Sequence, residues 1–393
     1  MSDSSKGYVD EGKSKGNNVT TTTDAGAAVA SNKATDVDIE VIKNRKLEGL
    51  RIPLKQNVQA KNISTYLEYV MLIHNALPEL DIEDIDTSTT FLNHKFSAPI
   101  IIDSMTGGTD EATMINERLA MVAEELNLGM GVGSQRAGLL SDTLMESYSI
   151  ARKSAPNAFL IANIGGVQLR NITLDDVKKM VDMIDADAIA VHLNPLQELI
   201  QPEGEPKFKG IYSKIVELVK SIDVPVIVKE VGSGISRDVA VRLELAGVKA
   251  INIAGSGGTS WAGVEKLRAD SSKAVMKSHL GELFWDWGIP TAINLLEVRR
   301  AVRIGIIASG GLRSGLDIAK CIALGADMCA LAWPFLKCAA ESRESVLDYA
   351  RVLIEELRAT MFLTGARDIK ALRRVRYSLQ GPLLEWFKTY ESR

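Results

Sequence analysis

The sequence predicts an α/β fold, a TIM-type (β/α)8 barrel with a disordered N-terminal tail. Eight short apolar runs recur after residue 39, helix-patterned segments lie between them, and most runs are followed by glycine together with a polar side chain. Strands that alternate with helices in this way form parallel sheets, and a barrel of this kind uses about 250 residues or more as one unit. The 393 residues therefore suffice for one barrel with extensions.

The first 38 residues differ in composition from the rest of the chain. They are rich in Ser, Thr, Asn, Gly, Asp and Ala and contain almost no large apolar side chain. Such a segment buries too little surface to offset the entropy that it loses on ordering. We therefore expect a flexible tail over residues 1–38 and a single barrel with C-terminal helices over residues 39–393.

The eight apolar runs have the character of strands in a parallel sheet. Several are β-branched and nearly continuous, which is typical of strands buried on both faces. An open, doubly wound sheet usually has fewer strands and would leave edges, so a closed barrel is favoured. The predicted strands are Ala98–Asp103, Leu128–Val132, Phe159–Asn163, Ala188–His192, Val224–Lys229, Ala250–Ala254, Gly305–Ser309 and Met328–Ala332.

The segments between these runs carry helical signals. Asp110–Leu126 has apolar residues at helical spacing, and Thr173–Ile184 opens with Thr-Leu-Asp-Asp, which places acidic groups at the positive end of a helix. Ser236–Ala246 and Ser314–Leu324 repeat the pattern, and the latter is closed by Gly325. Helices are therefore predicted over these four segments.

Composition excludes several classes of function. Lys and Arg number 46 against 50 Asp and Glu, a net charge of −4 that argues against a general nucleic-acid surface. Three cysteines, Cys321, Cys329 and Cys338, form neither a disulfide framework nor a metal-binding spacing, so we expect buried free thiols. No apolar run reaches the ~20 residues that span a bilayer, and no secretory leader is recognisable. We expect a cytoplasmic protein.

The residues after the predicted strands indicate one active site. In such barrels the loops at the carboxyl ends of the strands carry the chemistry. Here these exits combine glycine with polar side chains, whereas the amino ends of the strands, where helices lead into them, lack this combination. The exits are Ser104–Gly108, Gly133–Arg136, Asn163–Gly166, His192–Asn194, Lys229–Glu230, Gly255–Thr259 and Ser309–Arg313.

The exit after the seventh strand predicts a phosphate site. Gly310 and Gly311 allow backbone N–H groups to approach a phosphate, the following helix adds partial positive charge, and Arg313 adds charge-assisted hydrogen bonds. The eighth strand ends at Ala332, and the backbone donors of Ala332 and Trp333 would complete this phosphate cup. An isolated Gly-Gly is more often only a turn, but its place in the barrel and the neighbouring arginine favour a phosphate.

Lys229 ends the fifth strand and is predicted to direct its ammonium into the barrel mouth. There it can stabilise negative charge on a reduced cofactor. A surface lysine is the alternative, but the apolar approach Val224–Val228 counts against it. Because no dinucleotide fingerprint follows a strand, the phosphate cup and the interior lysine fit a flavin mononucleotide better than a dinucleotide.

The fourth strand exit and its continuation predict a cation and a substrate site. Residues Gln197–Glu205 are dense in carboxylate and amide oxygens, which suit a hard cation shared with substrate phosphates. For His192 a structural role and a substrate contact remain equally open. Ser134–Arg136 offers an amide and a guanidinium for an anion, and Arg45–Lys46 would have to fold over the mouth to add two cations.

Together these segments resemble type 2 isopentenyl-diphosphate isomerase, from about Asn44 to Phe362. The most specific pieces are Asn44–Lys46, Met105–Thr109, Gly133–Arg136, Ala162–Gly165, His192–Glu198, Gln201–Gly204 and Ser309–Gly311. The resemblance implies a flavoprotein that binds FMN, active in its reduced form, and Mg²⁺, with NADPH as reductant. It also implies an isoprenoid diphosphate substrate and a homotetramer or homo-octamer.

The resemblance also implies residue roles. FMN would contact Met105, Thr106, Gly107, Ser134, Asn163, Lys229, Thr259, Gly311, Arg313 and Ala332, to which the phosphate cup adds Gly310 and Trp333. The diphosphate or allyl site would be lined by Arg45, Lys46, Ser134, Gln135, Arg136, His192, Asn194 and Gln197. Glu198 would be the Mg²⁺ ligand. The catalytic residues would be Gln197, Lys229 and His192.

The family reaction is redox-neutral but requires reduced flavin. The double bond moves when one carbon is protonated and another loses a proton. Lys229 would favour the anionic reduced flavin, and Gln197 would move or position a proton. Two alternatives stay open: an FMN-dependent barrel oxidoreductase acting on a hydroxy acid or a nucleotide, and a non-catalytic flavin- or isoprenoid-binding paralogue.

One residue departs from the family pattern. After Arg-Lys the family usually has a histidine three residues on, where this sequence has Gly49. That histidine would contribute to the diphosphate site. We therefore expect weaker substrate binding and an unchanged reaction.

Overall fold

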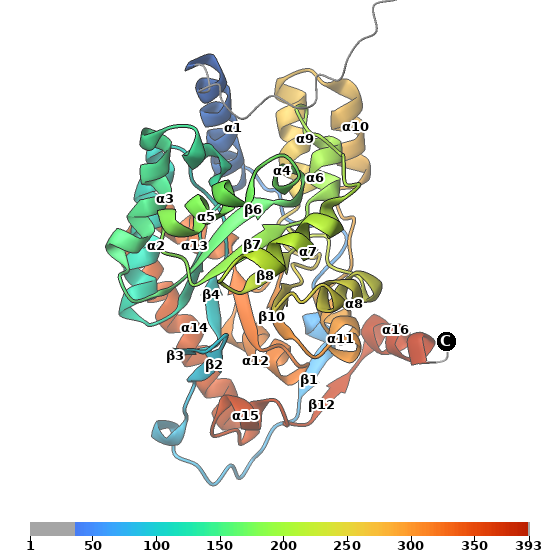
Figure 1. Cartoon of the computed structure of the whole chain (residues 1–393). Helices are drawn as coiled ribbons and strands as arrows, with labels where there is room; N and C mark the ends of the chain where they lie inside the picture. The colour runs from blue at the N-terminus through green and yellow to red at the C-terminus, as the bar shows by residue number, and fades with distance from the viewer. Residues whose placement is uncertain (1–35, 392–393) are drawn as a thin grey trace, which may run out of the picture.

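The computed structural model describes residues 36–391, and within them a closed barrel of eight parallel strands confirms the predicted fold (Figure 1). The strands are β4 (Ile100–Ile102), β5 (Gly129–Gly131), β6 (Phe159–Gly165), β7 (Ala188–His192), β8 (Val226–Lys229), β9 (Ala250–Asn252), β10 (Gly305–Ser309) and β11 (Met328–Leu331). The sheet closes where β11 pairs with β4, in a register that sets Ala330 opposite Ile101. The predicted tail falls mainly on residues 1–35, which lie outside the described part.

All eight predicted strands are present, with differences confined to their ends. The strand β9 stops at Asn252 instead of Ala254, because Ala254 has a φ of 39° that takes the chain out of the extended conformation. The strand β6 continues to Gly165, two residues beyond the predicted Asn163, and it pairs with β7 as far as His192. The exits of the strands are therefore placed as predicted.

The four predicted helices are confirmed as α2 (Asp110–Glu125), α5 (Leu174–Met183), α8 (Arg237–Leu245) and α12 (Gly315–Ala323). Both α5 and α12 begin with a capping box, in which the N-cap hydroxyl and an aspartate three residues later exchange hydrogen bonds with the backbone. The other helices are α1 (Asp36–Lys55), α3 (Asp142–Ser154), α4 (Gly166–Leu169), α6 (Pro195–Ile200), α7 (Ile211–Ser221), α9 (Trp261–Ser271), α10 (Val275–Leu283), α11 (Thr291–Ala301), α13 (Trp333–Glu341), α14 (Arg343–Thr364), α15 (Ile369–Leu372) and α16 (Gly381–Glu391).

Two small antiparallel sheets lie outside the barrel. The strand β1 (Val70–Leu72) pairs with β12 (Tyr377–Leu379), which brings a segment before the barrel against one after it. The hairpin β2 (Thr89–Phe91) with β3 (His94–Phe96) lies at the end of the barrel opposite α1 (Figure 1). Short 3-10 helices cover Leu67–Tyr69, Ile82–Asp84 and Gln135–Leu139.

The barrel interior is a packed apolar core. The rings of Phe96 and Phe159 lie 5.4 Å apart between centroids, and Phe91 of the hairpin joins the same cluster with Ile101 and Met328. The hairpin thereby fills the amino-terminal end of the barrel. A larger apolar core lies between the strands and the surrounding helices. The open space of the barrel is therefore confined to the carboxyl end, as the strand exits predicted.

The first helix and the segment after it lie over this carboxyl end, where α1 contacts α9 and α13 (Figure 1). Ile52 of α1 packs against the buried cluster of Val58, Val264 and Trp285. Ala60 N donates to Gly258 O (2.7 Å), which fixes the following segment against a strand exit. None of the helices in the described part of the chain is long and apolar enough to cross a membrane.

Candidate functional site

A cavity of about 380 Å³ lies at the carboxyl ends of the barrel strands. This volume is typical of pockets that hold a small molecule. Its wall contains at least one residue from the exit of every barrel strand. These are Asp103, Gly133, Asn163, His192, Lys229, Ala254, Ser309 and Ala332. The predicted convergence of the strand exits on one mouth is therefore confirmed.

Most of the predicted site residues line this cavity. They are Arg45, Lys46, Met105, Thr106, Ser134, Arg136, Asn163, His192, Gln197, Glu198, Lys229, Thr259, Gly310, Gly311, Arg313, Ala332 and Trp333. Gly107, Gln135 and Asn194 do not belong to the wall. The structure thus brings the two predicted halves of the site, cofactor and substrate, into one space.

Gln135 lies behind the wall because its side chain is used by the protein. It is fully buried, its Nε2 donates to Met180 O (2.8 Å), and its Oε1 accepts from Asn163 N (2.9 Å). Gly107 is likewise a packing position, since a Cβ there would come within 1.9 Å of the ring of Tyr148. Gln135 thus supports the wall through Asn163 and Met180, and Gly107 makes room for the Tyr148 ring, while their contacts with a ligand stay predictions.

The phosphate cup is built by backbone packed on backbone. Gly310 and Gly311 have φ values of 97° and 77°, and a Cβ on Gly310 would lie 2.0 Å from Gly255 O. A Cβ on Gly258 would lie 2.5 Å from the Cα of Gly311. Side chains are therefore excluded at the point where the exits of β9 and β10 meet, and the amides there remain bare enough to face an anion.

One part of the predicted cup differs in the structure. The first amides of α12 are already occupied, because Arg313 N and Ser314 N donate to Asp317 Oδ2 (3.0 and 3.1 Å) and Gly315 N donates to Glu356 Oε2 (2.6 Å). The helix end that the sequence indicated is thus capped by carboxylates. Of the predicted donors, the two glycines and the first turn of α13, which begins at Trp333, would then remain to face a phosphate.

Arg313 completes the cup with a side chain that is fixed on two sides. Its Nη2 donates to Gln59 Oε1 (2.6 Å), and its guanidinium lies 5.1 Å from the centre of the Trp333 ring. Gln59 Nε2 in turn donates to Thr259 Oγ1 (3.2 Å). Gln59 was not predicted, because a glutamine in the segment before the first strand has no local signal; only the tertiary fold brings it here.

Lys229 is buried, with its ammonium in the cavity wall, as predicted. Its Nζ donates to Glu230 O (3.0 Å) and lies 3.7 Å from Asp103 Oδ1. Asn252 Nδ2 donates to Asp103 Oδ2 (3.1 Å), and Ser309 Oγ donates to Asn252 Oδ1 (2.5 Å). These polar contacts form a continuous row across the floor of the cavity, from β8 through β4 and β9 to β10. Asp103 and Asn252 were missed as functional candidates, although both stand at or near predicted strand ends.

His192 is a half-buried and neutral imidazole. Its Nδ1 lies 2.8 Å from Asn163 Oδ1, a carbonyl oxygen, so Nδ1 donates and Nε2 is left as an acceptor. Desolvation, with the nearby charges of Lys229 and Lys46, lowers the pKa of His192 to about 3. The two interpretations that the sequence left open are therefore compatible: one nitrogen holds the wall, and the other is available to a ligand.

The basic pair of the first helix reaches the mouth, as predicted. Lys46 Nζ donates to Ser134 O (3.0 Å), and it lies 3.5 Å from the hydroxyl oxygen of Tyr148. Desolvation, and then the charge of Arg45, lowers the pKa of Lys46 to about 7. Burial raises the pKa of Tyr148, so the phenol stays protonated. An anion bound beside this ammonium would raise the pKa of Lys46 again and keep the side chain charged.

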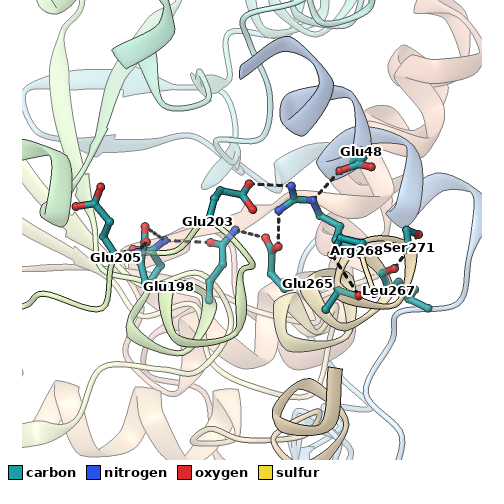
Figure 2. A network of polar contacts seen from close by, with 12 residues as sticks. Glu48, Glu198, Glu203, Glu205, Glu265, Leu267, Arg268 and Ser271 are labelled. Carbon is teal, nitrogen blue, oxygen red and sulfur yellow. Dashed lines mark hydrogen bonds and ion pairs between the residues drawn. The ribbon is translucent and has the colours of Figure 1, made fainter. Parts of the chain in front are cut away.

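The acidic side of the cavity is a continuous network (Figure 2). Gln197 Nε2 donates to Glu265 Oε1 (2.9 Å), while Asn194 Nδ2 donates to Gln197 Oε1 (3.1 Å) and lies 3.3 Å from Glu198 Oε1. Glu205 N donates to Glu198 Oε2 (2.8 Å). The amide of Gln197 is therefore oriented from both ends.

Glu265 has one further partner, Arg268 of α9, whose Nη1 donates to Glu265 Oε2 (2.7 Å). Desolvation is the largest influence on Glu265 and raises its pKa, against the opposing charge of Arg268. Neither residue was predicted. In the sequence of a helix, a glutamate and an arginine three residues apart look the same whether they form an exposed ion pair or line a site.

The predicted metal residue lies in a suitable but incomplete site. Glu198 is buried and lines the cavity, and the buried Oδ1 of Asn194 beside it has no hydrogen-bond partner in the described protein. Within residues 36–391, no group of three or more His, Cys, Asp or Glu is arranged to hold a metal ion. The donors thus fit a cation that takes few protein ligands and completes its shell with substrate phosphate and water, as Mg²⁺ does.

Gly49 lies in the cavity wall, on the turn of α1 after Lys46. A Cβ at this position would have no neighbour within 4 Å. The departure from the family pattern therefore leaves space at the mouth that no side chain of residues 36–391 occupies within 4 Å of such a Cβ.

Comparison with known proteins shows which families the chain resembles. Residues 176–378 match the family of FMN-dependent dehydrogenases. An isopentenyl-diphosphate delta-isomerase of Methanosarcina barkeri is 46% identical over 348 residues, which are 88% of this chain and 95% of the relative. One of Nostoc sp. is 47% identical over 344 residues, 87% and 97% of the two chains.

Among solved structures, mandelate oxidase is similar in fold. It has a TM-score of 0.58 and 18% sequence identity, and the match covers 87% of this chain and 98% of that one. At this identity the likeness concerns the barrel alone. Since the close relatives span nearly the whole described chain, the protein is an isomerase that belongs to the type 2, FMN-dependent isopentenyl-diphosphate delta-isomerase family.

Proposed function

We propose that this enzyme interconverts isopentenyl diphosphate and dimethylallyl diphosphate in the cytoplasm, with reduced FMN and Mg²⁺ bound and NADPH as the reductant. The observation that carries the proposal is one cavity whose wall includes both the glycines Gly310 and Gly311 and the polar residues His192, Gln197 and Glu198. The names of the relatives supply the substrate pair.

The cofactor end fits FMN. The bare amides of Gly310 and Gly311, with Arg313, would hold its phosphate, and Thr106, Asn163 and Lys229 would lie along its ring. When bound and reduced, FMN supplies an electron-rich ring that stabilises positive charge on the substrate and can exchange a proton. Lys229 places a buried ammonium at this end, which favours negative charge on the ring.

The substrate end fits a diphosphate held by cations. Arg45, Lys46 and Arg136 line the mouth and would bind phosphate oxygens directly. Glu198 would hold the Mg²⁺ that neutralises the remaining charge, with Asn194 nearby to steady its carboxylate. The hydrocarbon chain would then extend from the mouth towards the floor of the cavity.

The proton-handling residues would lie between the two ends. His192 is neutral, so its Nε2 accepts a hydrogen bond without adding positive charge beside a cation-like substrate. Gln197 cannot ionise; its amide, held by Asn194 and Glu265, would orient a proton in transit. Lys229 contributes by its charge. The enzyme would act as a homotetramer or homo-octamer.

The test is turnover with the reduced flavoprotein. Pure protein should be yellow or take up FMN. After reduction by NADPH or dithionite with Mg²⁺, it should convert isopentenyl diphosphate and incorporate deuterium from D₂O, as followed by NMR. Protein that remains colourless in excess FMN would contradict the proposal. Bleaching of oxidised flavin by a hydroxy acid would indicate the oxidoreductase alternative, and substrate binding without turnover would indicate the non-catalytic one.

A further inference from the structure

Arg268 pairs with three carboxylates that come from three different elements (Figure 2). Its Nε donates to Glu48 Oε2 of α1 (2.9 Å), its Nη1 to Glu265 Oε2 of α9 (2.7 Å), and its Nη2 to Glu203 Oε1 in the segment after α6 (2.8 Å). The planar guanidinium suits this role because its donors point in fixed, diverging directions. Lysine has a single charged point and cannot span three separate partners in the same way.

The three ion pairs differ in burial. The side chains of Arg268 and Glu265 are 8% and 3% exposed, whereas those of Glu203 and Glu48 are 37% and 49% exposed. Breaking the inner pair would leave a charge buried without a partner, which is costly. Breaking the pair with Glu48 returns a carboxylate to water at little cost. The contact with α1 is therefore the one that can open, while the contact with Glu265 persists.

Each of the three elements carries part of the cavity wall. Glu48 lies two positions after Lys46, whose ammonium reaches Ser134 O across the mouth. Glu265 receives the hydrogen bond from Gln197 Nε2. The segment that holds Glu203 also contributes the amide of Glu205 to Glu198. One guanidinium thus joins the helix that offers cations to a diphosphate with the carboxylate that orients the amide.

We propose that Arg268 is a positioning residue that couples the docking of α1 over the cavity to the orientation of the Gln197 amide. When α1 is docked, Glu48 draws the guanidinium outward and fixes its plane, and the guanidinium in turn fixes the Glu265 carboxylate that holds Gln197. Binding of a diphosphate to the cations of α1 is therefore linked to the geometry of the reacting end. By thermodynamic reciprocity, a diphosphate must stabilise the docked helix as much as docking strengthens its binding.

The coupling rests on the proposed function for the identity of the substrate, but its first test does not. The probe is inorganic diphosphate with Mg²⁺, added to the purified protein with its FMN. Hydrogen exchange of peptides from α1 is followed by mass spectrometry, and the affinity by calorimetry. The variants are Arg268→Gln and the milder Glu48→Gln. The matched control is Arg51→Gln, which removes an exposed ion pair of the same helix with Glu111 (3.0 Å).

Diphosphate should slow exchange of α1 in the unaltered protein. In Arg268→Gln this protection should largely disappear, and the affinity should fall by roughly fivefold or more. Glu48→Gln should weaken binding by about twofold to fivefold. Arg51→Gln should behave as the unaltered protein. Should Arg268→Gln not fold, Glu48→Gln against Arg51→Gln decides the matter alone.

A kinetic measurement separates positioning from plain support of the fold. Glu48→Gln should raise KM more than it lowers kcat, because it loosens only the outer contact. Arg268→Gln should change both, and Arg268→Lys should restore part of KM and little of kcat. Equal losses in Arg51→Gln and Glu48→Gln, or normal diphosphate protection in Arg268→Gln, would overturn the inference. If the unaltered enzyme shows the exchange pattern but no isomerisation, the proposed function fails and the coupling stands.

Discussion

The ammonium of Lys229 lies 3.7 Å from Oδ1 of Asp103, so the positive charge at the floor of the cavity has a buried counter-ion. Asn252 holds the other carboxylate oxygen and is itself held by Ser309. The charge that a bound flavin would meet is thus set by a pair and not by the lysine alone. Because Lys229 and Asp103 are both nearly excluded from water, their charges are little screened and would act strongly on a bound flavin.

The pair predicts opposite shifts of the flavin midpoint potential. Asp103→Asn removes a negative charge, favours the anionic reduced flavin and should raise the potential; Lys229→Met should lower it. Both shifts are expected to be on the order of tens of millivolts. A spectroelectrochemical titration of the FMN-loaded variants measures them. Shifts of the same sign in the two variants would contradict this account of the floor.

Lys46 predicts a pH dependence of diphosphate binding. The free enzyme has a Lys46 pKa of about 7, lowered by desolvation and by Arg45. A bound anion favours the charged form, so above this pH binding must take up a proton. The affinity should therefore fall as the pH rises, by up to about tenfold per unit. Lys46→Arg cannot lose its charge in this range. Titration of inorganic diphosphate from pH 6 to 9 should give a flatter curve for this variant; two parallel curves would exclude Lys46 as the cause.

Gly49→His should tighten substrate binding. The space beside the helix is free, since a Cβ meets nothing within 4 Å, and an imidazole there can reach the mouth. A hydrogen bond to a charged diphosphate would lower KM by about tenfold. Gly49→Ala is the control, because it gives at least as large a gain in helix propensity without a ring. If KM stays unchanged on Gly49→His, the missing histidine has no consequence for binding.

Gly310→Ala should abolish FMN retention. Its Cβ would lie 2.0 Å from Gly255 O at a φ of 97°, so the two strand exits would have to separate. Gly210→Ala gives the comparison, because Gly210 also has a positive φ, 88°, but open space around it. That variant should lose only about 1 kcal/mol of stability and keep its flavin. The ratio of FMN to protein after gel filtration is the measurement.

The sequence predicted the barrel well because strand burial and helix capping are local patterns. The exits that carry Lys229 and His192 follow directly from the strand ends, and the basic pair of the first helix was recognised through the family resemblance. What the sequence could not specify was side-chain direction. Gln135 occupies a strand exit, yet its rotamer points behind the wall.

The residues that complete the site could not be predicted from the sequence, because their roles depend on contacts that only the tertiary fold creates. Glu265 and Arg268 lie on a helix where charged residues are ordinary, and only the approach of α1 and α6 gives them a role. Gln59 is similar: its contacts with Thr259 and Arg313 join positions about 200 and 254 residues away. Such pairs leave no periodic signal in a single chain.

The aromatic hairpin at the amino-terminal end of the barrel determines how molecules enter and leave. Phe91, Phe96 and Phe159 close the amino-terminal end, so the barrel is not an open channel. The cavity lies at the carboxyl end, where α1 contributes Arg45, Lys46 and Gly49 to its wall, so substrate, product and flavin would share this end of the barrel. We therefore expect bound product to exclude substrate until it has dissociated by the route along which the substrate entered.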